Sequence, residues 1–180
     1  GGEFRGRPLA APSGSEIRPT SDRLRESLFN VLAHGLDDPV PGARVLDLFA
    51  GTGALGIEAL SRGADFVLFV EAGTEGRGLI RRNVEAFGLT GKTKIFRRDA
   101  TDLGPIGPIE PFDLVFADPP YRKGLGERAF SAALAGGWLK FGALLVLEEE
   151  AKVEIAPIPG LEEIDRRSAG IAQLVFFRSG

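Results

Sequence analysis

The chain has 180 residues and a mass of 19.2 kDa, a length that suits a single domain. It contains no cysteine and one histidine, which excludes disulfides, thiolate metal sites, a cysteine nucleophile and any multi-histidine metal centre. The net charge of −3 argues weakly against a strongly basic nucleic-acid-binding protein. Because the sequence shows neither an apolar run of membrane-spanning length nor an apolar leader, we expect a cytoplasmic monomer with no membrane or metal partner.

The predicted elements alternate between helices and strands along most of the chain. A first helix follows a cap at Thr20 or Ser21 and stops at Gly35. Apolar strands are then predicted at 44–49, 66–70, 94–97, 112–117 and 143–147, with helices at 51–63, 75–87 and 127–135 between them. Two antiparallel strands follow between Leu161 and Arg178.

This alternation predicts an α/β fold with a mostly parallel, seven-stranded sheet, helices on both faces and an antiparallel pair at one edge. We expect one domain, 1–180, in which 1–40 form an N-terminal arm and helix and 41–180 form the core. The segment 148–165 holds seven acidic residues against Lys152, and we expect it to be solvated surface.

The first chemical motif is the glycine-rich run from Asp47 to Gly56, which follows a predicted strand and opens a predicted helix. Gly51 and Gly53 allow a sharp turn and a close approach of the backbone to a ligand. Glu71 lies 20 residues after Gly51, at the end of the next strand, where a carboxylate can bind ribose hydroxyls. The motif therefore indicates an adenosine-containing cofactor, and NAD, FAD and S-adenosylmethionine all fit it. A tight strand–helix turn without a ligand is the alternative.

Asp47 favours one of these cofactors. A carboxylate just before the glycine turn repels the anionic pyrophosphate of NAD but attracts a cation. S-adenosylmethionine carries both a sulfonium and an ammonium group, so Asp47 favours it.

The second motif is Asp118-Pro119-Pro120-Tyr121, at the end of the fourth predicted strand. Proline has no N–H, so this loop presents acceptors, namely the Asp118 carboxylate and the proline carbonyls. Acceptors match the N–H donors of an exocyclic amine, and Tyr121 can stack on a base. A plain proline turn with a packed tyrosine is the alternative.

Together these motifs resemble S-adenosylmethionine-dependent class I methyltransferases with an Asp-Pro-Pro-Tyr motif, which have a Rossmann-like fold. The runs 1–7, 18–30 and 47–64 extend the resemblance to the bacterial 16S rRNA guanine-N2 methyltransferases over nearly the whole chain. The block Arg-Pro-Thr-x-x-x-x-Arg-Glu-x-x-Phe-Asn from Arg18 to Asn30 is its most specific part. One departure is Gly73, where the family often has a second acid.

The resemblance implies a catalytic core at 41–180 and an N-terminal lid at 1–40. It implies that Asp118 and the Pro119 carbonyl accept the N–H bonds of the target amine and stabilise its developing charge. The catalytic set is Asp118, Pro119, Pro120 and Tyr121. The expected cofactor contacts are Thr20, Asp47, Phe49, Gly51, Gly53, Glu71, Asp99 and Ala100, with Asp99 on the adenine amine and Thr20 equally well explained as a helix cap.

The implied partner is small-subunit rRNA, within a ribosomal particle rather than free. A purine must leave its stack to reach such a pocket, and cationic side chains can meet the phosphates around it. The candidates for this role are Arg5, Arg7, Arg18, Arg25, Arg122 and Lys123, although a lone surface arginine is more often simply solvated.

Three other functions remain open on the sequence. An adenine-N6 methyltransferase acting on DNA or RNA fits the acceptor pocket equally well. An NAD-dependent dehydrogenase fits the glycine run but not Asp47, and it leaves Asp118–Tyr121 unexplained. A non-catalytic binding module would keep the fold but is expected to lack the site residues.

Overall fold

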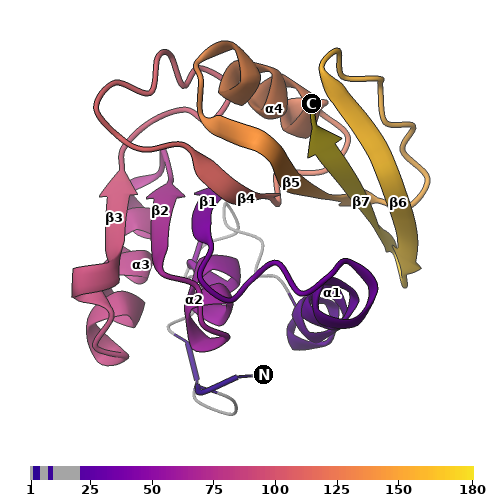
Figure 1. Cartoon of the computed structure of the whole chain (residues 1–180). Helices are drawn as coiled ribbons and strands as arrows, with labels where there is room; N and C mark the ends of the chain where they lie inside the picture. The colour runs from indigo at the N-terminus through magenta and orange to yellow at the C-terminus, as the bar shows by residue number, and fades with distance from the viewer. Residues whose placement is uncertain (1, 5–7, 10–20) are drawn as a thin grey trace.

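In the computed structural model, which describes residues 2–4, 8–9 and 21–180, a seven-stranded sheet forms the centre of the molecule. The strand order is β3-β2-β1-β4-β5-β7-β6 (Figure 1). The first five strands are mutually parallel, and β7 runs antiparallel to both β5 and β6. This confirms the predicted mostly parallel sheet with an antiparallel C-terminal addition.

The strands lie close to their predicted positions, with one exception. They are β1 (Arg44–Leu48), β2 (Phe66–Val70), β3 (Thr93–Phe96), β4 (Phe112–Ala117), β5 (Leu139–Glu150), β6 (Leu161–Ala169) and β7 (Ala172–Ser179). The exception is β5, which extends well beyond the predicted 143–147 because its last residues pair with β7, Glu148 with Leu174 and Glu150 with Ala172.

This extension corrects one expectation about the acidic segment. Glu148 and Glu149, which the sequence analysis assigns to solvated surface, are buried in the sheet. They continue the unbroken run of buried residues in β5. Glu154 and Glu162, farther along the same segment, are exposed. Local charge density alone does not distinguish the two cases, because burial here is decided by pairing with a distant strand.

In the described part of the chain, four α-helices cover the two faces of the sheet: α1 (Asp22–Gly35), α2 (Ala54–Ser61), α3 (Thr74–Ala86) and α4 (Leu125–Ala135). A short 3-10 helix at Thr90–Lys92 precedes β3. The first three helices pack on one face around Phe29, Ile57, Ile80 and Phe116. On the other face α4 packs with Phe130 against Trp138 and Leu147. The sheet is therefore buried on both sides, as its continuous apolar strands require.

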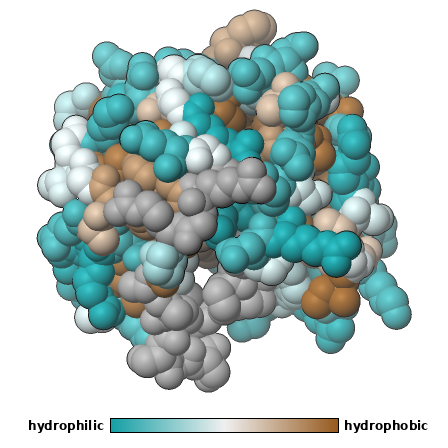
Figure 2. All heavy atoms as spheres, turned by 90° about the horizontal axis from the view of Figure 1, so that it is seen from below, coloured by the Kyte–Doolittle hydropathy of each residue, from teal (hydrophilic) through white to brown (hydrophobic). Residues whose placement is uncertain are grey.

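The start of α1 also follows the sequence expectation. Ser21 is the cap, and its side-chain oxygen accepts a hydrogen bond from the Leu24 amide at 3.1 Å. Thr20, the other candidate, lies outside the described residues. Among the described residues, no helix is long and apolar enough to cross a bilayer. Hydrophilic residues dominate the lower face of the molecule, with hydrophobic ones scattered among them (Figure 2).

Candidate active site

The two sequence motifs meet in one cleft at the carboxyl ends of β1 and β4. Its lining residues are Asp47, Phe49, Ala50, Gly51, Thr52, Ala54, Leu55 and Asp118. Strands β1 and β4 are neighbours in the sheet, with Leu48 opposite Ala117, so the residues that follow each strand emerge side by side. Ligands of open α/β sheets bind at such an edge.

Three glycines give the loop after β1 its shape. Gly51 and Gly53 have φ of 60° and 82°, which L-residues rarely adopt. Gly56, in the first turn of α2, lies against β2, and a Cβ there would come within 2.5 Å of the Phe69 ring. The first two glycines therefore permit the turn, and the third permits close packing of helix on strand. Phe49 also has a positive φ, 54°, a strained conformation of the kind concentrated at functional sites.

Neighbouring elements hold the loop at several points. The Ala50 amide donates to the Val70 carbonyl at 3.1 Å, which ties the loop to the end of β2. The Asn83 side chain of α3 donates to the Thr52 carbonyl at 2.9 Å in the buried interior. Sequence reasoning missed Asn83, and the available signal was a polar residue on the otherwise apolar face of its helix.

Asp47 is buried beneath this loop. Its Oδ2 accepts a hydrogen bond from the Gly56 amide at 3.0 Å. Burial raises the pKa of the Asp47 carboxyl well above its ordinary value, the Gly56 bond opposes the rise, and the charges of Asp118 and Glu71 add to it. A cation in the cleft would favour the ionised form of Asp47, so this buried carboxylate suits a positively charged ligand.

Glu71 follows β2 and connects that strand to the glycine loop. Its Oε1 accepts from the Gly51 amide at 2.8 Å and its Oε2 from the Gly73 amide at 3.0 Å. These bonds fix the carboxylate at the mouth of the loop, the place predicted for a ribose contact. A Cβ on Gly73 would lie 3.1 Å from Oε2, so the missing second acid coincides with a crowded position.

The two residues predicted to hold adenine lie after β3. Asp99 is exposed, and its Oδ1 accepts from the Thr101 hydroxyl and amide at 2.7 and 2.8 Å. These bonds hold the pKa of the Asp99 carboxyl below its ordinary value. Ala100 is buried against the ends of β1 and β2, packed in one cluster with Leu48 and Val70. The Asp99 carboxylate is therefore an ionised hydrogen-bond acceptor. Asp99 is not among the residues that line the cleft.

The loop after β4 carries the predicted catalytic residues. Asp118 and Tyr121 are half-buried, Pro119 is buried and Pro120 is exposed. The Tyr121 hydroxyl donates to Glu148 Oε2 on β5 at 2.5 Å. The two prolines contribute no N–H, and of this loop Asp118 lines the cleft.

Arg122 is tied to the two glutamates that follow. Its backbone amide, at a φ of 66°, donates to Glu149 Oε1 at 3.1 Å. Its guanidinium bonds both oxygens of Glu150, at 2.7 and 2.6 Å. Glu148, Glu149 and Glu150 are therefore site-supporting residues that sequence reasoning missed. The neighbouring Lys123 is exposed.

Of the other residues predicted to bind substrate, Arg25 lies in the described part of the chain. Arg25 is bonded to the buried Glu58 at 3.3 Å and to Asp22 at 2.9 Å, and only 16% of its side chain is exposed. Its position is accounted for by this ion pair with α2. Arg5, Arg7, Arg18 and Thr20 lie outside the described residues, so their predicted roles stay predictions.

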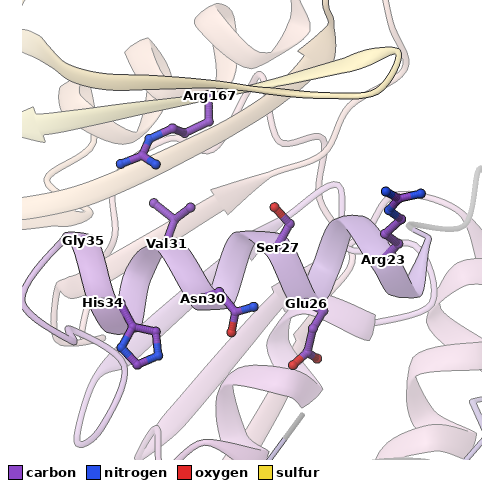
Figure 3. Close-up of a pocket in the computed structure, with 8 residues that line it drawn as sticks. All are labelled: Arg23, Glu26, Ser27, Asn30, Val31, His34, Gly35 and Arg167. Atoms are coloured by element: carbon purple, nitrogen blue, oxygen red, sulfur yellow. The ribbon is translucent and has the colours of Figure 1, made fainter.

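A separate and larger hollow, of about 660 Å³, lies between α1 and β6. Figure 3 shows Arg167 of β6 reaching toward α1 over Val31 and Gly35, while Arg23 extends from the start of the helix. This groove shares no lining residue with the cleft, and its walls mix arginines with Glu26. Elsewhere in 2–4, 8–9 and 21–180, no group of three acidic or histidine residues is arranged to hold a metal ion.

The strand order, the glycine loop after β1 and the acidic residues at the strand ends define a Rossmann-like class I methyltransferase. The chain belongs to the family described as "Conserved hypothetical protein 95", which matches residues 1–178. It is 38% identical to ribosomal RNA small subunit methyltransferase D of Escherichia coli K12, over 88% of this chain and 77% of that protein.

Two further relatives agree with this membership. The putative rRNA methyltransferase YlbH of Bacillus subtilis is 34% identical, over 88% of this chain and 85% of its own length. The solved structure of the putative methyltransferase yhhF from Escherichia coli matches with a TM-score of 0.81 and 33% identity, covering 99% of this chain and 95% of that one. The resemblance to small-subunit rRNA methyltransferases predicted from the sequence is confirmed.

Proposed function

We propose that this protein transfers a methyl group from S-adenosylmethionine to the exocyclic N2 amine of a guanine in small-subunit rRNA. The observation that carries the proposal is the convergence of Asp47, Gly51 and Asp118 on one cleft. A cofactor motif and an amine-binding motif on a single cleft are what group transfer between the two ligands requires. The names of the relatives support the rRNA substrate.

The residues around the glycine loop fit this cofactor. The buried carboxylate of Asp47 offers a counter-charge to a cationic ligand, and Glu71 stands at the ribose position with both oxygens aligned by backbone amides. Phe49, Gly53 and Ala100 shape the same edge, and Asp99 supplies an ionised acceptor for the adenine amine. When bound, S-adenosylmethionine supplies an electrophilic methyl group.

The loop after β4 activates the target. An aromatic amine is a poor nucleophile because its lone pair is delocalised into the ring. The Asp118 carboxylate and the Pro119 carbonyl accept its two N–H bonds, which orients the lone pair and stabilises the positive charge that develops on nitrogen. Tyr121 stacks on the base, and the methylated nitrogen then loses a proton to Asp118 or water. Arg122 and Lys123 follow Tyr121 directly. Their role in the proposal is to bind the phosphates of the flipped nucleotide.

Two of the alternatives make different predictions. An adenine-N6 methyltransferase uses the same acceptors, and only the family membership favours guanine. A dehydrogenase would bind NAD, whose pyrophosphate is repelled by the acidic groups of the cleft. A thermal shift assay separates these cofactors, because a ligand that binds only the native state raises the melting temperature. We expect a rise with S-adenosylmethionine and none with NAD.

The decisive test is the transfer of labelled methyl groups to purified, unmodified small ribosomal subunits and to their naked rRNA, followed by nucleoside analysis. We expect N2-methylguanosine, formed in the particle rather than in naked rRNA. N6-methyladenosine would keep the amine pocket but overturn the substrate. No transfer to either, with cofactor binding intact, would overturn the substrate class.

A further inference from the structure

The end of β5 has an unusual composition for a central strand. Leu144, Val146 and Leu147 are buried, and the strand then continues into two glutamates that are also buried, with 4% exposure at Glu148 and 1% at Glu149. Moving a carboxylate out of water is costly, and apolar residues of similar size often stabilise a fold as well or better. Fold stability alone therefore does not account for these acids.

The surroundings of Glu148 show why burying its carboxylate costs free energy. The small hollow that it lines is walled mainly by apolar side chains of α1, α2, β4, β5 and β7, including Leu28, Phe116 and Leu174, with Arg25 as the other charged residue. Out of this hollow, Glu148 Oε2 accepts the Tyr121 hydroxyl at 2.5 Å across 27 residues of sequence. The bond joins the buried strand directly to the loop that follows Pro120.

Glu148 and its two neighbours bind different parts of that loop. Glu148 takes the tip of the Tyr121 side chain, Glu149 takes the backbone amide of Arg122, and Glu150 takes the Arg122 guanidinium. A tyrosine ring turns about two side-chain bonds. The hydroxyl lies on the axis of the second bond, so anchoring it fixes the rotation about the first bond and therefore where the ring lies. Glu148 is thus placed to decide the position of the ring.

We propose that Glu148 is a positioning residue, which holds the Tyr121 ring in the position in which the target base stacks on it. The inference rests on the proposed function and deepens it, because it assigns the specificity of base capture to a residue of β5. Glu148 acts on the base through its hydrogen bond to the Tyr121 hydroxyl, so its effect on base capture must disappear when that hydroxyl is removed.

The test compares Glu148→Leu, Glu148→Gln, Tyr121→Phe and the double variant Glu148→Leu/Tyr121→Phe, with Glu154→Gln as the control. Glu154 is an exposed acid of the same segment, so this control makes the same charge change as Glu148→Gln. We expect Glu148→Leu and Tyr121→Phe each to raise KM for small subunits about tenfold, the equivalent of one hydrogen bond, with little change in kcat. S-adenosylmethionine affinity should be unchanged, and the double variant should be no worse than either single variant.

Glu148→Gln keeps an oxygen acceptor, so it should recover most of the loss, and Glu154→Gln should behave as the wild type. Additive losses in the double variant, or a normal KM in Glu148→Leu, would overturn the assignment. A purely structural role would instead lower the melting temperature and cofactor affinity together.

A second readout does not depend on activity. Tyr121 is the sole tyrosine of the sequence, so labelled tyrosine reports this one ring by NMR. We expect cross-peaks between the Tyr121 ring and protons of β5 in the wild type and their loss in Glu148→Leu, and unchanged ring signals would overturn the proposal. If the ring responds as expected but the wild type methylates no small-subunit RNA, then the proposed function has failed, and the positioning role falls with it.

Discussion

The loop after β1 and the loop after β4 border the same cleft, but different kinds of partner hold them in place. The glycine loop is shaped by its own backbone, through the positive φ angles of Gly51 and Gly53, and several elements of the fold bond to it, among them Glu71 after β2 and Asn83 of α3. The proline loop is held by carboxylates of a single strand, β5, that lie 27 or 28 residues farther along the chain.

This difference matches the two binding tasks of the proposed function. A cofactor with one fixed shape suits a loop whose geometry is built into its backbone. For a target base that must be drawn out of RNA, the loop after β4 offers a tyrosine and an arginine that carboxylates of β5 hold in place. Variants that impair one loop and spare the other separate the two tasks.

Asp118→Ala should impair methyl transfer to the target amine and leave cofactor binding intact. Removing an acceptor that stabilises developing charge lowers kcat by roughly 10²–10³-fold, so methyl transfer should almost disappear. Because the Asp118 charge raises the pKa of Asp47, its removal should leave cofactor affinity equal or slightly higher. Single-turnover methylation and calorimetric titration of the cofactor measure the two effects, and wild-type-like transfer would refute the role.

Asp47→Asn should weaken cofactor binding and leave the reaction with the target amine intact. Losing a charged partner in a buried site is expected to weaken S-adenosylmethionine binding by roughly 10–100-fold, the equivalent of one charge-assisted hydrogen bond. Asparagine is neutral and can still accept from the Gly56 amide, so the ligand-free variant should melt at a higher temperature than the wild type at neutral pH. Equal melting temperatures would show that burial of the charge is not a cost to the fold.

The pH dependence follows from the same residue. The pKa of Asp47 is raised in the folded protein, so between its ordinary value and the raised value the native state holds a proton that the unfolded state has lost. This contribution to stability is therefore largest at low pH and decreases as pH rises through that interval. Conversely, cofactor affinity should increase with pH as Asp47 ionises.

Both pH trends should be absent in Asp47→Asn, which serves as the control. Melting temperatures and titrations of cofactor from pH 5 to pH 8 measure them. An affinity that falls with rising pH would contradict the assignment of Asp47 to the cationic end of the cofactor.

Gly56→Ala tests the packing of α2 on β2. The added Cβ would meet the Phe69 ring at 2.5 Å and Val67 at 2.8 Å, so the helix must shift, at a cost of about 1–3 kcal/mol in unfolding free energy. Chemical denaturation measures this loss. Gly78→Ala in α3 is a matched control, because nothing lies within 4 Å of a Cβ there and alanine favours a helix.

Asn83→Ala should destabilise the fold about as much as Gly56→Ala and should change cofactor binding far less than Asp47→Asn. The variant leaves the buried Thr52 carbonyl without its side-chain donor, at a cost of about 1–3 kcal/mol in unfolding free energy. Because Thr52 lines the cleft, cofactor affinity should also fall by a few fold, whereas KM for RNA should not change. A change in RNA binding alone would mean that α3 supports the loop after β4 and not the glycine loop after β1.

The same contrast explains what could be predicted from sequence. The parallel sheet and the glycine loop were predictable because strand periodicity and the spacing of Gly51, Gly53 and Gly56 are local signals. Asp118 was predictable because it follows an apolar strand directly. The partners of the loop after β4 could not be predicted, because Glu148 and Glu149 are buried through the pairing of β5 with the distant strand β7.

The predicted phosphate contacts show a second limit. Arg25 and Arg122 look equivalent in the sequence, as basic residues near a motif. The structure pairs both with glutamates, Arg25 with Glu58 and Arg122 with Glu150, but 70% of the Arg122 side chain stays exposed against 16% of that of Arg25. A charge on a helix gives no information about which opposite charge the tertiary fold brings to it, so sequence cannot separate the two.

The most direct test measures cofactor affinity and single-turnover methyl transfer in parallel for wild type, Asp47→Asn and Asp118→Ala, with small ribosomal subunits as the substrate. The account predicts that Asp47→Asn loses affinity but recovers most of its transfer at saturating cofactor. It predicts that Asp118→Ala binds cofactor normally and transfers almost nothing. If both variants lost affinity and transfer together, the division of the cleft between a cofactor carboxylate and a target carboxylate would be wrong.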